Sequence, residues 1–269
     1  MDRQAAEEAN RRLWNELTPV HLRAYPVKEF LAGRCTLKPV EVAEVGDVRG
    51  RGLLHLQCHF GLDTLSWQRR GAVVTGVDIS DASIERAREL SADSGLAARF
   101  IRASVYDLPA QLNEKFDIVY TGIGVLVWLA DLAEWARIVA RFLSPDGFFY
   151  LYEFHPFMHV FNSRTAGFVV NESYFHSPEP TVYADDEGDY ADPEYVPKNP
   201  SYEWQWTLGD VVSALTAAGL HIEFLREHPG TVEPRLPGMV LGDNGLWDLP
   251  DLPGRLPMMF SLKARPEPA

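Results

Sequence analysis

The residues best suited to chemistry lie between positions 53 and 78, where two apolar segments frame a tight turn. The apolar segment 53–56 predicts a buried parallel strand, and Gly61 in the turn after it opens a helix. A second apolar segment, 73–77, leads directly to Asp78. An acidic side chain at the end of a second parallel strand, about twenty residues after such a turn, is placed to accept both hydrogen bonds of a ribose diol. This segment therefore predicts a site for a nucleoside cofactor.

The turn itself lacks the glycines of a dinucleotide fingerprint. The pattern G-x-G-x-x-G lets bare backbone approach a pyrophosphate at the N-terminus of a helix. Here Gln57, His59 and Phe60 occupy the turn, and only Gly61 remains. A cofactor with an amino-acid tail and a sulfonium needs no close approach by a phosphate, so the turn favours that kind of cofactor over a nicotinamide dinucleotide.

The run His-Leu-Gln-Cys-His-Phe-Gly resembles the first motif of class I S-adenosylmethionine-dependent methyltransferases. Two of the family's usual glycines are replaced by Gln57 and His59, and His55 stands where an acid is usual. The resemblance implies that the cofactor is S-adenosylmethionine. Because of these departures, the match downstream of the motif decides the assignment.

Downstream segments continue the resemblance in the order of the family's sheet. The resemblance puts an adenine-contacting turn at Ser104 and Val105, and it puts the end of the fourth strand, Thr121, against the methionine part of the cofactor. The expected elements are strands at 100–103, 115–121, 147–153, 221–225 and 258–264, and helices at 126–143 and 208–218. The implied fold is α/β, a Rossmann-like three-layer methyltransferase fold whose seven-stranded sheet is mostly parallel with an antiparallel last strand.

Composition and charge exclude several classes of protein. A chain of 269 residues can bury a large core, and one elaborated α/β domain is the expected organisation. The 38 acidic and 25 basic residues give a formal net charge of −13, which argues against nucleic acid or an anionic membrane as partner. Two cysteines provide no disulfide framework, and no segment suits a signal peptide or a membrane span, so we expect a cytoplasmic protein. The oligomeric state is left open.

Two segments outside the shared core are expected to select the substrate. The N-terminal segment carries Trp14 and Tyr25 and predicts a helical lid, although packing of these rings against the sheet edge is an equal alternative. The second segment, residues 157–206, combines many aromatic side chains with prolines and the acidic run 185–187. This composition predicts a folded cap or else a solvated acidic loop. The expected division is an N-terminal helical lid at 1–45, a cofactor-binding core at 46–156, a cap at 157–206 and the completion of the core sheet at 207–269.

A catalytic residue is harder to predict, because methyl transfer from a sulfonium is an in-line displacement that depends mainly on alignment. A general base helps when the acceptor must lose a proton. His155, just after the fifth strand, is the predicted base because its ordinary pKa lies near 6.5, although a histidine satisfied by backbone at a strand end fits equally well. Glu153, Tyr25 and Trp128 are predicted to contact the substrate. The spacing of His155 and His159 would suit a metal on a helix, but an intervening proline and the lack of a third ligand lead us to expect no metal.

The implied function is transfer of a methyl group from S-adenosylmethionine to an O, N or C atom of a small molecule. The alternatives are a non-methylating enzyme on the same fold, a cofactor-binding or scaffolding module, and a nicotinamide-dependent dehydrogenase, for which the turn lacks two glycines. The residues expected to bind the cofactor are Gln57, His59, Phe60, Gly61, Asp78, Ile79, Ser104, Val105 and Thr121.

Overall fold

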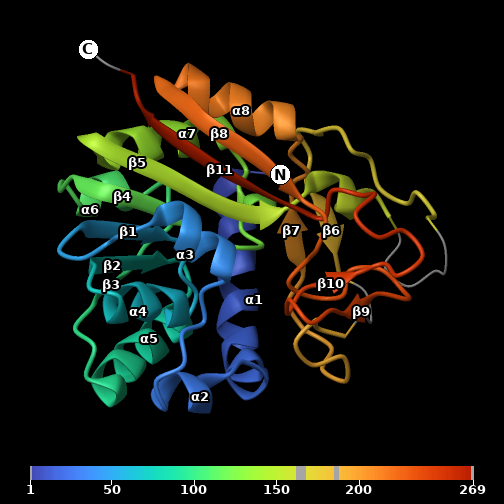
Figure 1. The fold of residues 1–269 in the computed structure, drawn as a ribbon, viewed down its shortest axis with the longest axis horizontal. Coiled ribbons are helices and arrows are strands. Elements are labelled where there is room, and N and C mark those ends of the chain that lie inside the picture. The colour runs from blue at the N-terminus through green and yellow to red at the C-terminus, as the bar shows by residue number, and fades with distance from the viewer. Residues whose placement is uncertain (1, 162–167, 185–187, 268–269) are drawn as a thin grey trace.

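A seven-stranded sheet forms the centre of the computed structural model, which describes residues 2–161, 168–184 and 188–267. Its strands are β1 (Gly52–Leu56), β2 (Val73–Asp78), β3 (Arg99–Arg102), β4 (Phe116–Thr121), β5 (Leu143–Phe154), β8 (Leu220–His228) and β11 (Met259–Pro266). Their order is β3-β2-β1-β4-β5-β11-β8 (Figure 1). The strands from β3 to β5 are parallel, and β11 is antiparallel to both of its neighbours. The expected α/β fold with an antiparallel last strand is therefore confirmed.

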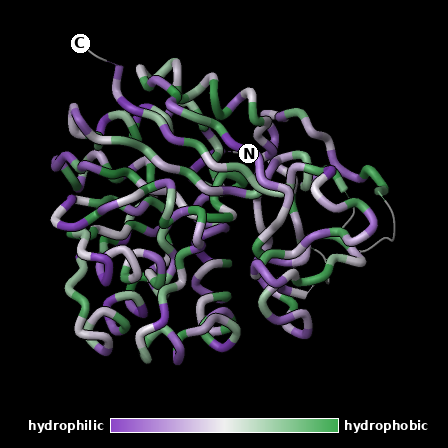
Figure 2. Tube along the Cα trace, viewed as in Figure 1, coloured by the Kyte–Doolittle hydropathy of each residue, from purple (hydrophilic) through white to green (hydrophobic). Residues whose placement is uncertain are grey.

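Helices cover both faces of this sheet (Figure 1). They are α1 (Arg3–Ala24), α2 (Val27–Leu31), α3 (Pro39–Val45), α4 (Leu62–Arg69), α5 (Asp81–Ser94), α6 (Leu108–Gln111), α7 (Leu132–Phe142) and α8 (Leu208–Ala217), with short 3₁₀ helices η1 (Leu126–Trp128) and η2 (Pro156–Val160). The trace alternates between hydrophilic and hydrophobic residues along these helices, as expected where one side is buried (Figure 2).

Strand alternation divides the core between the two faces. Leu54 of β1 packs with Trp135 of α7 on one face, whereas its neighbour Leu53 packs with Trp67 of α4 on the other. A smaller third cluster joins the turn after β1 to α2, α4 and α5 and contains Phe60 and Phe100. The turn that begins α4 is thus anchored by its own apolar side chains.

The expected helix at 126–143 is shorter in the structure. Residues 126–128 form η1, and α7 begins only at Leu132 because Asp131 caps it, its side chain accepting a hydrogen bond from Glu134 N at 2.8 Å. The Asp131 backbone is also fixed by the Tyr106 hydroxyl, at 2.9 and 3.1 Å. Residues 144–147 already belong to β5, whose pairing with β4 shifts register.

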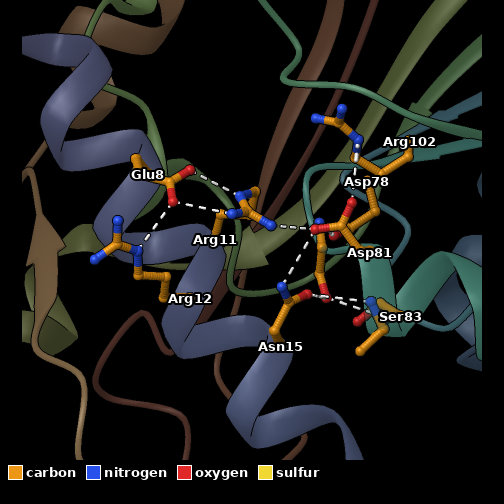
Figure 3. Close-up of polar contacts among 10 residues, drawn as sticks. Glu8, Arg11, Arg12, Asn15, Asp78, Asp81, Ser83 and Arg102 are labelled. Carbon is orange, nitrogen blue, oxygen red and sulfur yellow. Dashed lines mark hydrogen bonds and ion pairs between the residues drawn. The ribbon is translucent and has the colours of Figure 1, made fainter.

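The long N-terminal helix α1 spans 22 residues and continues through Pro19. It packs against α5 near the end of β2, and Figure 3 shows Arg11 and Asn15 turned toward Asp81, close to Asp78. Asn15 Oδ1 accepts a hydrogen bond from Ser80 Oγ at 2.7 Å, and Arg11 forms an ion pair with Asp81. These contacts hold α1 over the carboxyl end of β2.

The third helix of the N-terminal segment, α3, packs on the sheet. Its Glu44 accepts hydrogen bonds from Tyr150 of β5 at 2.9 Å and from Arg226 of β8 at 2.8 Å, and Glu41 accepts one from the Tyr120 hydroxyl. Residues 39–45 therefore belong to a layer that covers the sheet, whereas α1 crosses the strand ends.

Two segments after β5 lie side by side at one end of the sheet (Figure 1). One is the expected cap, with β6 (Thr181–Tyr183) and β7 (Ser201–Glu203), and the other is the connection 229–257, with β9 (Val240–Leu241) and β10 (Trp247–Asp248). The acidic run Asp185, Asp186 and Glu187 lies outside the described residues. Among the described helices, none combines the length and apolar character needed to cross a membrane.

The cap is fastened to α1 by the carboxylate of Glu16, a partly exposed residue. Glu16 accepts hydrogen bonds from the backbone of Lys198 at 2.8 Å and of Asn199 at 3.1 Å, and from the Tyr195 hydroxyl at 2.8 Å. Six residues earlier, the Asn10 side chain donates to the backbone O of Tyr202 and accepts from its backbone N–H. The described part of the cap is therefore held against α1 by these hydrogen bonds.

Candidate functional site

A cavity of about 1190 Å³ opens at the carboxyl ends of β1, β2 and β4. The sheet order reverses between β1 and β4, and ligands of open α/β sheets bind in the crevice beyond such a reversal. The core lines one wall of the cavity, and the N-terminal segment (with α1 and residues 34–40), the cap and the connection 229–257 contribute the other. The three lining segments outside the core thus meet at the position where the sheet itself favours binding.

The turn after β1 has the backbone shape of a glycine-rich loop without most of the glycines. Gln57, His59 and Gly61 all have positive φ values, of 57°, 50° and 78°. The first two are the non-glycine residues with positive φ in the described chain. Side chains at such positions cost roughly 1–2 kcal/mol each, and this kind of strain concentrates at binding sites. A Cβ on Gly61 would lie 2.7 Å from the Phe100 ring, so this position accepts only glycine.

Asp78 lies at the end of β2 with its carboxylate held by backbone. Oδ2 accepts a hydrogen bond from His59 N at 2.7 Å, and Oδ1 accepts one from Ser80 N at 2.9 Å. Burial raises the pKa of this carboxyl to about 6, although the backbone donors act against the rise. The group is therefore ionised at neutral pH and faces the cavity beside the turn.

The turn after β3 forms the next part of the same wall. Ser104 Oγ accepts a hydrogen bond from Tyr106 N at 3.3 Å, and Val105 is buried beside it. Glu7 of α1 approaches this turn: burial raises the pKa of its carboxyl, and a hydrogen bond from Ser104 partly opposes that rise. Ile79 lines the cavity between Asp78 and this turn.

Most of the predicted site residues line this one cavity. They are Tyr25, Gln57, His59, Phe60, Gly61, Asp78, Ile79, Ser104, Val105, Trp128 and Glu153. Thr121 does not: its side chain is fully buried, and the cavity wall is formed by the residues that follow it, 122–125. The loop that follows β4, and not the last residue of the strand, therefore borders the cavity.

The structure does not bring His155 to the cavity. Alternation along β5 would put His155 on the side of Glu153, but the strand ends at Phe154 and His155 becomes the N-cap of η2. Its Nδ1 accepts a hydrogen bond from Phe157 N at 3.1 Å, and its Nε2 lies 3.1 Å from Glu227 Oε1 on the partly exposed side of β8. His155 is therefore a residue at a strand end whose ring is bound by a backbone N–H group, which was the alternative to a catalytic base.

Glu153 lies at the cavity wall, but its carboxylate is bound by backbone N–H groups. Its oxygens accept hydrogen bonds from the backbone N–H groups of Gly124 at 2.6 Å, Val125 at 2.8 Å and Leu126 at 3.1 Å. Burial raises the pKa of Glu153, and these donors oppose the rise. Glu153 therefore fixes the loop after β4 that borders the cavity.

Other residues of the cavity were not among the predicted site residues. Trp14 of α1 packs edge-on against Trp128, with ring centroids 5.2 Å apart. Arg235 lies over the ring of Phe154, with its Cζ 3.9 Å from the centroid, and it forms an ion pair with Glu233 at 3.2 Å. These residues come from segments distant in sequence, so only the fold reveals their proximity.

Two titratable groups of the wall also went unpredicted. Glu203 of β7 lines the cavity, and burial raises the pKa of its carboxyl while Ser201 and Arg235 oppose the rise. His55 stands where the family's acid is usual; burial lowers its pKa to about 3, so the ring is neutral, and Nδ1 lies 2.7 Å from Thr64 Oγ1. Within the described residues, no group of three or more His, Cys, Asp or Glu side chains is arranged to hold a metal ion.

Comparison with known proteins adds family information to this geometry. The sequence model of the methyltransferase domain family matches residues 54–151. The ubiquinone biosynthesis O-methyltransferase of Saccharophagus degradans is 29% identical over 106 residues, which cover 39% of this chain and 44% of that protein. The protein of the same name from Pseudomonas syringae pv. tomato is 26% identical over 132 residues, 48% of this chain and 56% of that one. The chain thus spans about half the length of the curated relatives it matches.

Solved structures share the fold over most of the chain. An S-adenosylmethionine-dependent methyltransferase from Mesorhizobium loti superposes with a TM-score of 0.58 at 22% identity, over 87% of this chain and 99% of that one. DhpI, solved as a complex with SAH, superposes with a TM-score of 0.56 at 14% identity, over 98% of both chains. The expected family is confirmed: residues 54–151 form a domain of the methyltransferase family, on a sheet with the fold of class I S-adenosylmethionine-dependent methyltransferases.

Proposed function

We propose that this protein transfers a methyl group from S-adenosylmethionine to an O, N or C atom of a small molecule. One observation carries the proposal: Asp78 and the turns at 57–61 and 104–105 line one wall of a cavity whose other wall is aromatic and charged. Such an arrangement can hold a nucleoside cofactor and a second ligand in contact. The methyltransferase domain match at 54–151 supports the same activity.

In this proposal the cofactor lies along the core wall. Asp78 accepts hydrogen bonds from the ribose hydroxyls, and Ile79, Ser104 and Val105 enclose the adenine. Gln57 is available to the methionine part of the cofactor, because its Oε1 is buried at the cavity wall with no hydrogen-bond partner among the described residues. The turn offers no glycine-lined cradle for a pyrophosphate, which disfavours a nicotinamide dinucleotide.

Catalysis then depends chiefly on alignment. In-line displacement needs the acceptor atom held close to the methyl group and opposite the sulfur, and the facing walls of the cavity can hold the two ligands in this way. The faces of Trp14 and Trp128 favour a positively charged sulfonium nearby. For an acceptor that must lose a proton, we propose Glu203 as the base, since it lines the cavity and its raised pKa makes it a better proton acceptor than an ordinary carboxylate.

The acceptor is proposed to be small and not a nucleic acid. A net charge of −13 opposes binding to phosphate backbones. The two curated relatives are named O-methyltransferases, so oxygen is the first acceptor atom to test. A reducing, cytoplasmic location is also proposed, in keeping with Cys35 and Cys58, which are both free thiols.

The test is to incubate the purified protein with S-adenosylmethionine and a panel of small phenols, alcohols and amines, and to follow S-adenosylhomocysteine (SAH) by mass spectrometry. Acceptor-dependent formation of SAH supports the proposal. Tight binding of SAH without turnover of any acceptor would favour a cofactor-binding module or a non-methylating enzyme. Co-purification of a nicotinamide dinucleotide would favour a dehydrogenase and overturn the proposal.

A further inference from the structure

A chain of buried polar side chains links the cap to the cofactor turn through α1. Asp189 Oδ1 of the cap lies 3.1 Å from His21 Nε2, and His21 Nδ1 lies 3.1 Å from His59 Nε2. The chain ends at α5, where His59 Nδ1 lies 2.9 Å from Ser83 Oγ. His21 is completely buried and Asp189 is 7% exposed. Four segments that are distant in sequence are therefore joined by one line of hydrogen bonds.

The two histidines differ in what they face. His21 is stacked on Tyr25 with centroids 5.7 Å apart, is edge-on to Trp14, and has the Tyr190 hydroxyl 3.4 Å from its Nδ1. The titratable groups around it are thus Asp189 and Tyr190 from the cap, Tyr25 from the end of α1, and His59 from the turn. Among these described groups, Asp189 is the one carboxylic acid beside His21. A hydrogen bond to a carboxylate is charge-assisted, so the bond at His21 Nε2 is the strongest that the ring makes.

His59 touches the cofactor site with its main chain as well as its ring. Its backbone N–H donates to the Asp78 carboxylate at 2.7 Å, and its left-handed φ of 50° orients that N–H. Both ring nitrogens are already engaged, by His21 and Ser83, so the ring has no lone pair left for a substrate proton. Burial, with His21 as a lesser cause, lowers the pKa of His59 well below its usual value, and the ring stays neutral. Its role is therefore positional.

We propose that His21 is a positioning residue that fastens the cap to the cofactor turn, so that the cofactor enters and leaves only when the chain Asp189–His21–His59 breaks. The inference rests on the proposed function. Because Asp189 and His21 lie beside the turn that holds Asp78, opening the cap withdraws support from the ribose-binding carboxylate. The chain thus couples closure of the cap to retention of the cofactor.

Release of SAH tests the coupling directly. Trp14 and Trp128 line the cavity and provide a fluorescence signal for stopped-flow displacement of bound SAH. His21→Phe keeps a ring for packing but removes the hydrogen bonds to Asp189, His59 and Tyr190, and we expect it to speed release about 10-fold or more. Asp189→Asn keeps a carbonyl oxygen for His21 Nε2 and should stay within about 3-fold of wild type, whereas Asp189→Leu should match His21→Phe. This rescue by asparagine is not expected from loss of packing.

The control is Glu16→Gln. Glu16 also fastens the cap to α1, through Tyr195, Lys198 and Asn199, but it does not reach the cofactor turn. We expect this variant to lose thermal stability while releasing SAH at nearly the wild-type rate. Equal acceleration by Glu16→Gln, or unchanged release in both His21→Phe and Asp189→Leu, overturns the inference while SAH binding by wild type still supports the proposed function. If wild type binds no SAH in calorimetry, the proposed function fails first and this inference falls with it.

Discussion

Gln57 and His59 show how a binding turn can keep its shape after losing its glycines. Both occupy the left-handed region, with φ values of 57° and 50°, in a turn whose His59 N–H donates to the Asp78 carboxylate. The strain is offset by side-chain contacts that glycine would lack: Gln57 Nε2 donates to Val125 O at 3.2 Å, and the His59 ring joins the chain from His21. In this turn, hydrogen bonds of the two side chains therefore stabilise a backbone shape that glycine would adopt without strain.

Replacing Gln57 by glycine tests this balance. Gln57→Gly relieves the positive φ but adds freedom to the unfolded chain and removes one hydrogen bond, so the free energy of unfolding should change by less than about 1 kcal/mol. Gln57→Val puts a β-branched residue at the same φ and should cost about 2 kcal/mol or more. Urea unfolding of both variants measures the difference. A large loss in Gln57→Gly together with a tolerated valine would show that the turn is not strained at this residue.

The Asp78 carboxylate should make cofactor binding depend on pH. Its pKa is raised to about 6, above the usual value near 3.9, so without ligand the folded state loses stability as pH rises from about 4 to 6. Ribose hydroxyls donate to the ionised form, so protonation competes with binding. We expect the Kd for SAH to be constant above pH 7 and to rise up to tenfold per unit below about pH 6, as measured by calorimetry.

Asp78→Asn is the matching variant for that experiment. It should weaken SAH binding by about 1.5–3 kcal/mol at pH 7 and remove most of the pH dependence. Asp93→Asn, at an exposed position on α5, is the control and should bind like wild type. A wild-type affinity in Asp78→Asn would contradict the ribose assignment.

Substitution of Glu203 is expected to slow turnover, whereas substitution of His155 is expected to lower stability and not to change how the rate depends on pH. Glu203→Gln removes a proton acceptor from the cavity and should lower the rate by about 10²- to 10⁴-fold for an acceptor that must be deprotonated. His155→Ala removes a buried side chain that caps η2, so it should lower thermal stability yet leave the shape of the pH–rate profile unchanged. A changed profile in His155→Ala alone would restore His155 as the base.

At the scale of elements, the order of the core could be predicted because each strand is a short apolar segment bounded by turn residues. Asp78 was predicted as a site residue from its place after the second strand, and the turn at 104–105 was predicted by resemblance. The limits of the local pattern show at strand and helix ends. Alternation could not reveal that β5 ends at Phe154, nor could helical spacing reveal that Asp131 caps α7. Asp131 is held by Glu134 N within its own helix and also by the distant Tyr106 hydroxyl.

The outer wall of the cavity was the least predictable part. Aromatic density predicted a folded cap, whereas the sequence of the connection 229–257 predicted only a link between two strands. Its residues Glu233 and Arg235 reach the cavity because the chain folds back beside the cap, with Thr231 bridged to Trp247. No local sequence pattern predicts that the connection 229–257 folds back in this way, because the fold depends on contacts between segments without regular periodicity.

The packing of the cofactor turn on β2 and β3 gives an element-scale prediction. A Cβ added to Gly76 of β2 would lie 2.7 Å from the Phe100 ring and 2.9 Å from Cys58 Sγ. Gly76→Ala should therefore cost about 1–3 kcal/mol and loosen the turn. Gly209→Ala, in α8, is the control: its Cβ would meet nothing closer than 3.6 Å, and the helix should gain about 0.5–1 kcal/mol. Thermal unfolding compares the two, and equal stability changes would contradict the packing argument.

At the scale of the whole molecule, the cavity is closed by segments from both ends of the chain. The α1 helix lies across the strand ends, the cap is hydrogen-bonded to it, and the connection 229–257 lies beside the cap (Figure 1). The core sheet supplies the wall proposed to hold the cofactor, and the additions supply the wall proposed to meet the acceptor. Substrate choice can thus change through the outer segments while the cofactor wall is kept.

Because the site draws on so many segments, ligand binding should stabilise the whole fold. A ligand present at 100 times its Kd adds about 2.7 kcal/mol, which for a chain of this size corresponds to a rise in Tm of roughly 5–10 °C. We expect SAH to produce this shift and NAD to produce none, since the turn lacks a pyrophosphate cradle. Asp78→Ala, with its Kd weakened about 100-fold, should gain only about 0.4 kcal/mol, or 1–2 °C, at the same SAH concentration. Differential scanning fluorimetry measures all three cases. An equal shift for NAD, or an undiminished SAH shift in Asp78→Ala, would mean that the stabilising ligand binds elsewhere than along the wall formed by Asp78 and the cofactor turn.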